Sequence, residues 1–165
     1  MSDLMLLNIC ISFLFGAIFG SFSNVLIYRL PGEESIGGRS RCKSCNNVVP
    51  WKHNIPFFSY FILRGKCSSC QVQFSLRYPL VEFIMACLFA AVVYQYSVSW
   101  TALEYLILVF GLVTAAFIDF DHMILPDEIT LGGLVIGLIG AALNPERGFI
   151  EALLKVLFGN GILWL

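Results

Sequence analysis

An acidic cluster closes a long apolar stretch in the second half of the chain and is the strongest candidate for catalysis. The segment 117–130 reads FIDFDHMILPDEIT. Its ionisable side chains are Asp119, Asp121, His122, Asp127 and Glu128. Only 13% of the chain is charged, so composition alone does not explain this concentration. Because a carboxylate at the end of a membrane segment is energetically costly, the cluster indicates a functional site.

Paired carboxylates can serve as a general acid and a general base. Two aspartates that share a proton acquire different pKa values and can activate a water molecule for attack on a peptide carbonyl. Asp119 follows a run of mostly apolar residues and is the candidate for one member of such a pair. Asp121 or Asp127 could be the other only if the carboxyl groups lie within about 3 Å. Asp127 and Glu128 also fit a simpler role, because acidic side chains stabilise the first turn of a helix.

Other hydrolytic patterns are missing from the sequence. It contains neither the HExxH motif of zinc proteases nor the GxSxG turn of serine hydrolases. Ser21 or Ser23 with His122 could imitate a Ser–His pair, but no third residue is positioned to orient the histidine. Carboxylate chemistry is therefore the favoured interpretation.

Four of the six cysteines form two CxxC pairs and predict a zinc site. The pairs are Cys42 with Cys45 and Cys67 with Cys70. Four thiolates complete a tetrahedral site and leave no open position, so the zinc would be structural. The alternatives are unrelated reduced thiols or two disulfides, and the cytoplasm disfavours disulfides. His53 lies between the pairs and could replace a cysteine ligand, but we interpret it as a loop residue.

Composition indicates an integral membrane protein. The 165-residue chain is 58% hydrophobic, whereas soluble domains are about 45–50% apolar. Its mean hydropathy is +0.82. We therefore expect membrane lipid around much of the chain. The net charge of −1 gives no general attraction to nucleic acid, and we expect no nucleic-acid partner.

Apolar segments divide the chain into three parts and predict an all-α polytopic membrane protein. Residues 1–30 form a first membrane helix, 31–79 a soluble zinc-binding insert, and 80–165 a membrane domain. The apolar runs are 4–27, 80–98, 101–118, 129–143 and 149–165, which gives four to five membrane helices. Gly16 and Gly20 form a GxxxG motif, which either permits close helix packing or is an incidental spacing in an apolar helix. For Glu82 we favour a place in the first turn of a helix over an inward-facing polar role.

The distribution of basic residues predicts the orientation. Eight of the ten Lys and Arg residues lie between Arg29 and Arg77. Basic residues next to membrane segments mark the cytoplasmic side, so the insert should be cytoplasmic. Alternating crossings then place Asp119 at the cytoplasmic end of the third segment, on the same side as the insert.

Four ordered motifs resemble those of the type IV prepilin peptidases (leader peptidase/N-methyltransferases) of bacterial pilus and type II secretion systems. The resemblance covers essentially the whole chain. It rests on GSFSNVLIYRLP at 20–31, the two CxxC pairs with LRGKC at 63–67, RYPLVE at 77–82, and IDFD at 118–121 followed by LPD at 125–127. The same order of motifs along the chain makes the resemblance specific.

The resemblance implies a membrane aspartic endopeptidase of the bacterial inner membrane. Such enzymes cleave the basic leader of type IV prepilins or pseudopilins on the cytoplasmic side, then methylate the new N-terminus with S-adenosyl-L-methionine. The resemblance also implies a catalytic role for Asp119. The spacing from Asp119 to Pro126 matches shorter relatives that carry a single aspartate there, which favours Asp119 over Asp121. No S-adenosyl-L-methionine-binding residues are assigned.

The sequence departs from the family pattern near its end. The family's second catalytic aspartate lies in a GxGD motif, and this chain has none. Gly159-Asn160-Gly161 does not replace it, because asparagine does not ionise. We therefore expect the chain to be the N-terminal portion of a longer enzyme and inactive as a protease by itself. The alternative is a non-catalytic membrane zinc module that binds a cytoplasmic partner through its basic insert. A small proton-relay transporter is a weaker hypothesis, because acids deeper in the helices are lacking.

Overall fold

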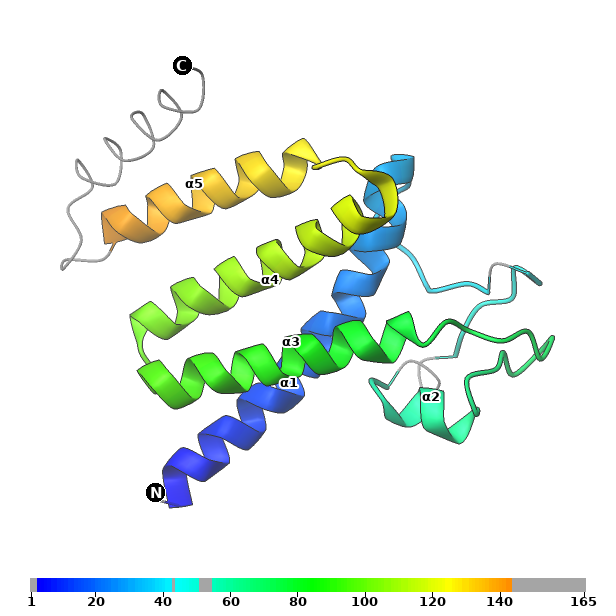
Figure 1. Cartoon of the computed structure of the whole chain (residues 1–165), viewed down its shortest axis with the longest axis horizontal. Coiled ribbons are helices and arrows are strands. Elements are labelled where there is room, and N and C mark those ends of the chain that lie inside the picture. The colour runs from blue at the N-terminus through cyan, green and yellow to red at the C-terminus, as the bar shows by residue number, and fades with distance from the viewer. Residues whose placement is uncertain (1–2, 43, 51–54, 144–165) are drawn as a thin grey trace. The chain divides into compact units, whose positions relative to one another are not determined.

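The fold of the described residues is helical. A computed structural model describes residues 3–42, 44–50 and 55–143 (Figure 1). Its elements are α1 (Asp3–Arg29), the 3-10 turn η1 (Leu30–Gly32), α2 (Phe58–Ile62), α3 (Arg77–Tyr96), α4 (Trp100–His122) and α5 (Asp127–Leu143). The chain divides into two compact units, Met1–Ile124 with α1 to α4 and Leu125–Leu165 with α5.

Among the described residues, three helices are long and apolar enough to cross a membrane. They are α1 together with η1, α3 and α4. The chain is thus a multi-pass, α-helical membrane protein with a cysteine-bearing insert after its first helix, as the sequence predicts. The fourth apolar run forms α5, a helix of 17 residues. The fifth run at 149–165, the turn before it and His53 lie outside the described residues.

Two helix boundaries differ from the expected ones. Helix α3 begins at Arg77 rather than near residue 80, which places Pro79 in its first turn. Proline, which has no backbone N–H, is tolerated there because the N–H groups of a helix's first turn have no hydrogen-bond partner within the helix. Helix α4 continues to His122 rather than ending near residue 118, so Asp119 and Asp121 belong to its last turns.

The GxxxG motif packs α1 against α3. A Cβ atom added to Gly16 would lie 2.7 Å from the Cα of Ala86, and one added to Gly20 would lie 2.6 Å from the Cα of Glu82. Real Cβ atoms do not approach backbone this closely, so only glycine allows the two helices to meet here. The motif therefore has the packing role that the sequence left open.

We expect Gly20→Val to destabilise the helix pair. The new side chain would meet the α3 backbone, which has no flexible end that can move aside. Overpacking of this kind costs about 1–3 kcal/mol in free energy of unfolding. Thermal unfolding in detergent measures the effect. Ile18→Ala, at an exposed position of the same helix, is the control and should change the melting temperature little.

Polar side chains join the three membrane helices inside the first unit. The hydroxyl groups of Ser23 on α1 and Thr114 on α4 are both buried and lie 2.9 Å apart. The Asn24 side chain donates to the carbonyl oxygen of Tyr78 on α3 at 3.0 Å. Interhelical hydrogen bonds of this kind hold membrane helices together. They also place the end of α1 beside the start of α3.

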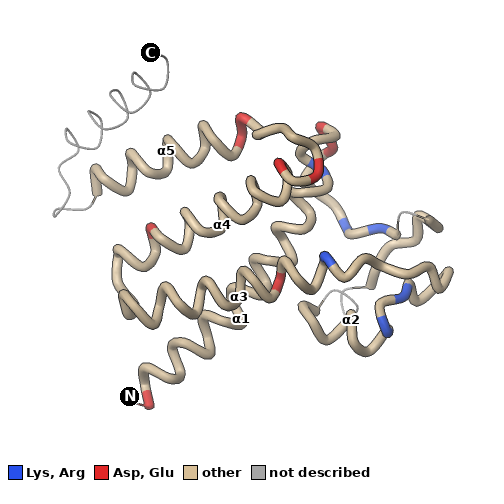
Figure 2. Tube along the Cα trace, in the orientation of Figure 1, with Lys and Arg blue, Asp and Glu red and all other residues tan. Residues whose placement is uncertain are grey.

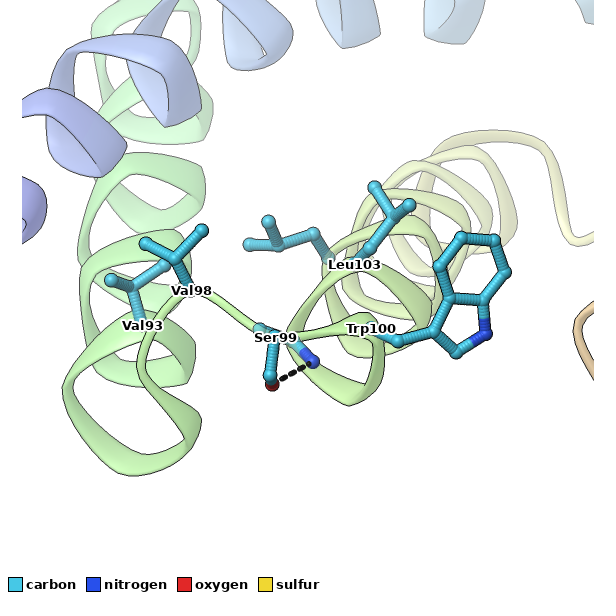
Figure 3. Close-up of a pocket in the computed structure, with 7 residues that line it drawn as sticks. Val93, Val98, Ser99, Trp100 and Leu103 are labelled. Carbon is cyan, nitrogen blue, oxygen red and sulfur yellow. Dashed lines mark hydrogen bonds between the residues drawn. The ribbon is translucent and has the colours of Figure 1, made fainter. Parts of the chain in front are cut away.

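The turn between α3 and α4 forms the opposite end of this helix pair. Ser99 caps α4, because its hydroxyl accepts a hydrogen bond from the amide of Ala102 at 3.1 Å (Figure 3). Val93, Val98 and Leu103 line a small cavity at this turn (Figure 3). The cavity is almost entirely apolar and offers no group for catalysis.

Candidate active site and metal centre

The two CxxC pairs meet in one four-cysteine cluster. The sulfur atoms of Cys42 and Cys70 lie 3.7 Å apart, and those of Cys45 and Cys67 lie 4.0 Å apart. All four sulfur atoms lie within 4.8 Å of one another. Four thiolates around a zinc ion at about 2.3 Å would have sulfur atoms about 3.8 Å apart. The cluster therefore has the ligand set and the dimensions of a structural zinc site.

Each pair sits in the same kind of backbone turn. The amide of Asn46 donates to the carbonyl of Cys42 at 2.8 Å, and the amide of Gln71 donates to that of Cys67 at 3.0 Å. Asn46 and Gln71 both adopt positive φ, at 56° and 61°. The first pair is closed by a bridge between Arg41 and Val48, and the second by one between Lys66 and Gln73. The insert thus folds as two similar loops around one centre.

Backbone amides prepare the thiols for a metal ion. The amides of Cys45 and Ser44 lower the pKa of Cys42 by hydrogen bonding to its sulfur. In the second loop the amides of Cys70 and Ser69 lower the pKa of Cys67 to about 6. The amide of Val72 lowers the pKa of Cys70, but burial and the neighbouring thiols together raise it to about 12. Because thiolates rather than thiols bind metals, the turns favour the binding-competent form at Cys42 and Cys67.

Asp121 forms an ion pair at the point where the insert meets α3. Its carboxylate contacts the guanidinium group of Arg77, the first residue of α3. Arg77 also donates to the carbonyl oxygen of Phe117 at 3.3 Å, and its guanidinium carbon lies 5.5 Å from the centre of the Phe117 ring. The pair fixes the acidic end of α4 against the start of α3. Within the first unit, the end of α4 that carries Asp121 therefore lies beside the start of α3, where the insert ends.

Asp119 is in a different situation from Asp121. It is exposed, whereas its neighbour Ile118 is fully buried. Its backbone carbonyl accepts the amide of Met123, which ends α4. Within the described residues its carboxylate has neither a hydrogen bond nor an ion pair. A carboxylate at the negative end of a helix is unfavourable, so this position of Asp119 does not stabilise α4.

Asp127 and Glu128 begin α5 and follow Pro126. They stand in the first turn of the helix, as the sequence predicts. Their negative charges complement the positive end of the helix dipole. Asp127 and Glu128 belong to the second unit, whereas Asp119 and Asp121 belong to the first.

The surroundings of Glu82 differ from those that we favoured on the basis of the sequence. It is buried in the second turn of α3, and one carboxylate oxygen accepts a hydrogen bond from the amide of Phe57 at 3.0 Å. The hydroxyl of Ser21 lies close enough to hydrogen-bond the same carboxyl group. Glu82 is thus the inward-facing polar residue that we considered the less favoured alternative. The sequence carries no signal for its partner, because Phe57 lies 25 residues away.

Known protein families match nearly the whole chain. Residues 14–96 match the bacterial peptidase A24 N-terminal domain, and residues 106–165 match the type IV leader peptidase family. A "Prepilin leader peptidase/N-methyltransferase" of Neisseria gonorrhoeae is 37% identical over the full length of this chain and 68% of its own. The chain belongs to the type IV leader peptidase family.

Two further relatives that carry the same name have a comparable sequence identity to this chain. The relative from Myxococcus xanthus is 40% identical over 89% of this chain, and the one from Aeromonas hydrophila is 36% identical over 92%. The chain spans 44% and 61% of the length of these two relatives. No solved structure matches the chain.

In this member of the type IV leader peptidase family, we expect Glu82→Ala to leave the backbone amide of Phe57 without its hydrogen-bond acceptor. A hydrogen bond to a charged group contributes about 1.5–3 kcal/mol, so the amide of Phe57 should exchange with solvent at least about tenfold faster. Hydrogen exchange followed by mass spectrometry measures this rate. Glu82→Gln retains an oxygen acceptor and should preserve most of the protection. Equal exchange in the wild type and Glu82→Ala would contradict the anchoring role.

Proposed function

We propose that the chain is part of a membrane aspartic endopeptidase that removes the leader of type IV prepilins or pseudopilins. Asp119 is one of its catalytic carboxylates. The observation that supports this role is the contrast between two neighbouring aspartates. Asp121 is neutralised by Arg77, whereas Asp119 is exposed and has no partner among the described residues. The printed names of the relatives support the substrate class.

In this mechanism each acidic residue has a separate task. The carboxylate of Asp119 accepts a proton from the attacking water molecule and returns a proton to the leaving amine. Its partner is a second carboxyl group, which in its protonated form donates a hydrogen bond to the carbonyl oxygen under attack. The Asp121–Arg77 ion pair holds the end of α4 and so positions Asp119. Burial of Ile118 against the helix bundle fixes the same turn from the other side.

The four cysteines would hold a zinc ion that acts as a structural link. The ion would supply the cross-link that joins the two loops of the insert, because the four sulfur atoms leave no position for a substrate. A folded insert then keeps Arg77 and Glu82, which border it, in their places at the start of α3.

S-adenosyl-L-methionine would supply the methyl group for the N-methyltransferase reaction that the relatives' names include. One described cavity lies at the turn between α3 and α4, and the other lies between α1, α3 and α4. Apolar side chains line most of the surface of both cavities. Such a lining does not fit the charged amino-acid portion of this cofactor. We therefore assign none of the described residues to the methyl-transfer step.

We further propose that the insert and Asp119 face the cytoplasm of a bacterium, across its inner membrane. Supporting this orientation, Lys and Arg residues concentrate on the insert between α1 and α3 (Figure 2). The leader of the substrate would then meet the site on the cytoplasmic side of the membrane.

The test is leader removal by the full-length protein that contains this chain. It would be produced in cells that make a type IV prepilin but lack their own leader peptidase. Mass spectrometry of the pilin should show a shortened and methylated N-terminus. If the leader stays attached while the protein is in the membrane with its metal bound, the non-catalytic zinc module becomes the better description.

A further inference from the structure

The insert carries an apolar segment whose pattern of burial is inverted. In the α2 segment, residues 55–62, the side chains of Phe58, Phe61 and Ile62 are 64%, 73% and 75% exposed. The small polar residue Ser59 is buried in the same segment. A soluble loop would be expected to bury the aromatic residues and expose the serine. Clustered exposed apolar side chains instead mark a surface that contacts a partner or a membrane.

The backbone holds the α2 segment in one conformation. Phe57 adopts φ 58° and ψ −55°, and the amide of Phe58 donates to the carbonyl of Pro56 at 2.6 Å. These values describe a strained γ-turn. The amide of Phe57 donates to Glu82, and the amide of Ile55 donates to the Ser59 hydroxyl at 2.9 Å. The exposed side chains of α2 are thus presented by a backbone that is fixed on both sides of the turn.

The α2 segment lies against the outer surface of the membrane helices. The Phe57 ring stacks on Phe13 of α1 at 6.3 Å between centroids and meets Phe83 of α3 edge-on at 6.4 Å. Both helices are candidate membrane spans, and the Phe83 side chain is itself 54% exposed. An apolar surface therefore continues from the spans onto α2.

The charges beside α2 fit a phospholipid surface. Arg64 and Lys66 follow the helix directly, and both are exposed. Segments that combine inserted aromatic or aliphatic side chains with nearby basic residues bind the boundary between acyl chains and headgroups. Anionic headgroups attract such basic residues at the membrane surface.

We propose that the α2 segment lies in the membrane–water interface and inserts Phe58, Phe61 and Ile62 into the bilayer that surrounds α1 and α3. Arg64 and Lys66 then contact lipid phosphate groups. The cysteine cluster, whose two CxxC pairs flank this segment in the sequence, is held at the membrane surface as a result. This inference rests on the membrane spans and does not require the proposed peptidase activity.

Photo-crosslinking of the full chain in phospholipid nanodiscs tests the proposal. The photoreactive residue p-benzoyl-phenylalanine replaces Phe61 in one variant and Val72 in another. Val72 is also exposed but lies on the second cysteine loop, outside the α2 segment. In a third variant the photoreactive residue replaces Phe15, an exposed position of the α1 span. After illumination, intact-mass spectrometry measures the fraction of protein that carries a phospholipid.

We expect lipid adducts at position 61 to approach the yield at position 15 and to exceed the yield at position 72 severalfold. Equal yields at 61 and 72, or an adduct only at 15, would overturn the proposal. Adducts of position 61 with a second polypeptide would also overturn it and assign the α2 face to a protein partner. Metal content measured on each variant shows that the insert has folded, since the substituted side chains are exposed and lie outside the cysteine cluster.

Discussion

Replacing Asp119 with asparagine in the full-length protein is expected to abolish leader cleavage. Asparagine keeps the size of the side chain but neither accepts nor releases the proton that hydrolysis requires. Loss of a general acid–base group lowers the rate by about 10²- to 10⁴-fold. The rate of conversion of a prepilin to its mature form, measured in membranes, gives the effect. The protein should still fold, because the Asp119 carboxylate has no partner among the described residues.

Asp121→Asn is the matched control, two positions away on the same helix end. Here the substitution removes the ion pair with Arg77 rather than the proposed catalytic group. We expect a reduction in cleavage of less than about tenfold, since an exposed ion pair contributes only about 0–1 kcal/mol. Unchanged cleavage in Asp119→Asn, or a greater loss in Asp121→Asn, would assign the catalysis to another residue.

Removing one cysteine of the cluster is expected to have the second large effect. Cys67→Ser should reduce bound zinc from one ion per chain to almost none, because three thiolates no longer complete the tetrahedral site. Structural zinc contributes about 10–16 kcal/mol to the folding of zinc-finger peptides. The insert should therefore unfold between α1 and α3. Metal analysis and limited proteolysis of residues 33–76 measure the two consequences.

Cys87→Ser is the control for the cysteine chemistry. Cys87 is exposed on α3 and is not a member of the cluster. This variant should keep its zinc and the wild-type proteolysis pattern. A zinc content that is equal in Cys67→Ser and the wild type would mean that the four cysteines do not form the metal site.

Local patterns in the sequence were sufficient to predict much of this structure. Apolar run lengths indicate the helices, and the spacing of Cys42, Cys45, Cys67 and Cys70 predicts the cluster that the structure assembles. The position of Asp127 in the first turn of α5 follows from the proline before it. In each case residues close together in the chain determine the outcome.

Contacts between distant segments could not be predicted in this way. The pairing of Arg77 with Asp121 depends on how α3 and α4 cross, and these residues lie 44 positions apart. The hydrogen bond from Phe57 to Glu82 requires a γ-turn in the insert and a buried position on α3 at the same time. Neither crossing angle nor turn geometry leaves a regular pattern in a single sequence. These are also the contacts that distinguish Asp119 from Asp121 and hold α2 against the spans.

Carbodiimide labelling of carboxylates tests the central claim most directly. The full-length enzyme in membranes would be treated in the presence and absence of a prepilin, and each modified residue would be identified by mass spectrometry. We predict that labelling of Asp119 parallels the loss of cleavage activity, that the prepilin protects Asp119, and that Asp121 reacts much less because of its ion pair with Arg77. Inactivation without modification of Asp119, or preferential modification of Asp121, would contradict the account.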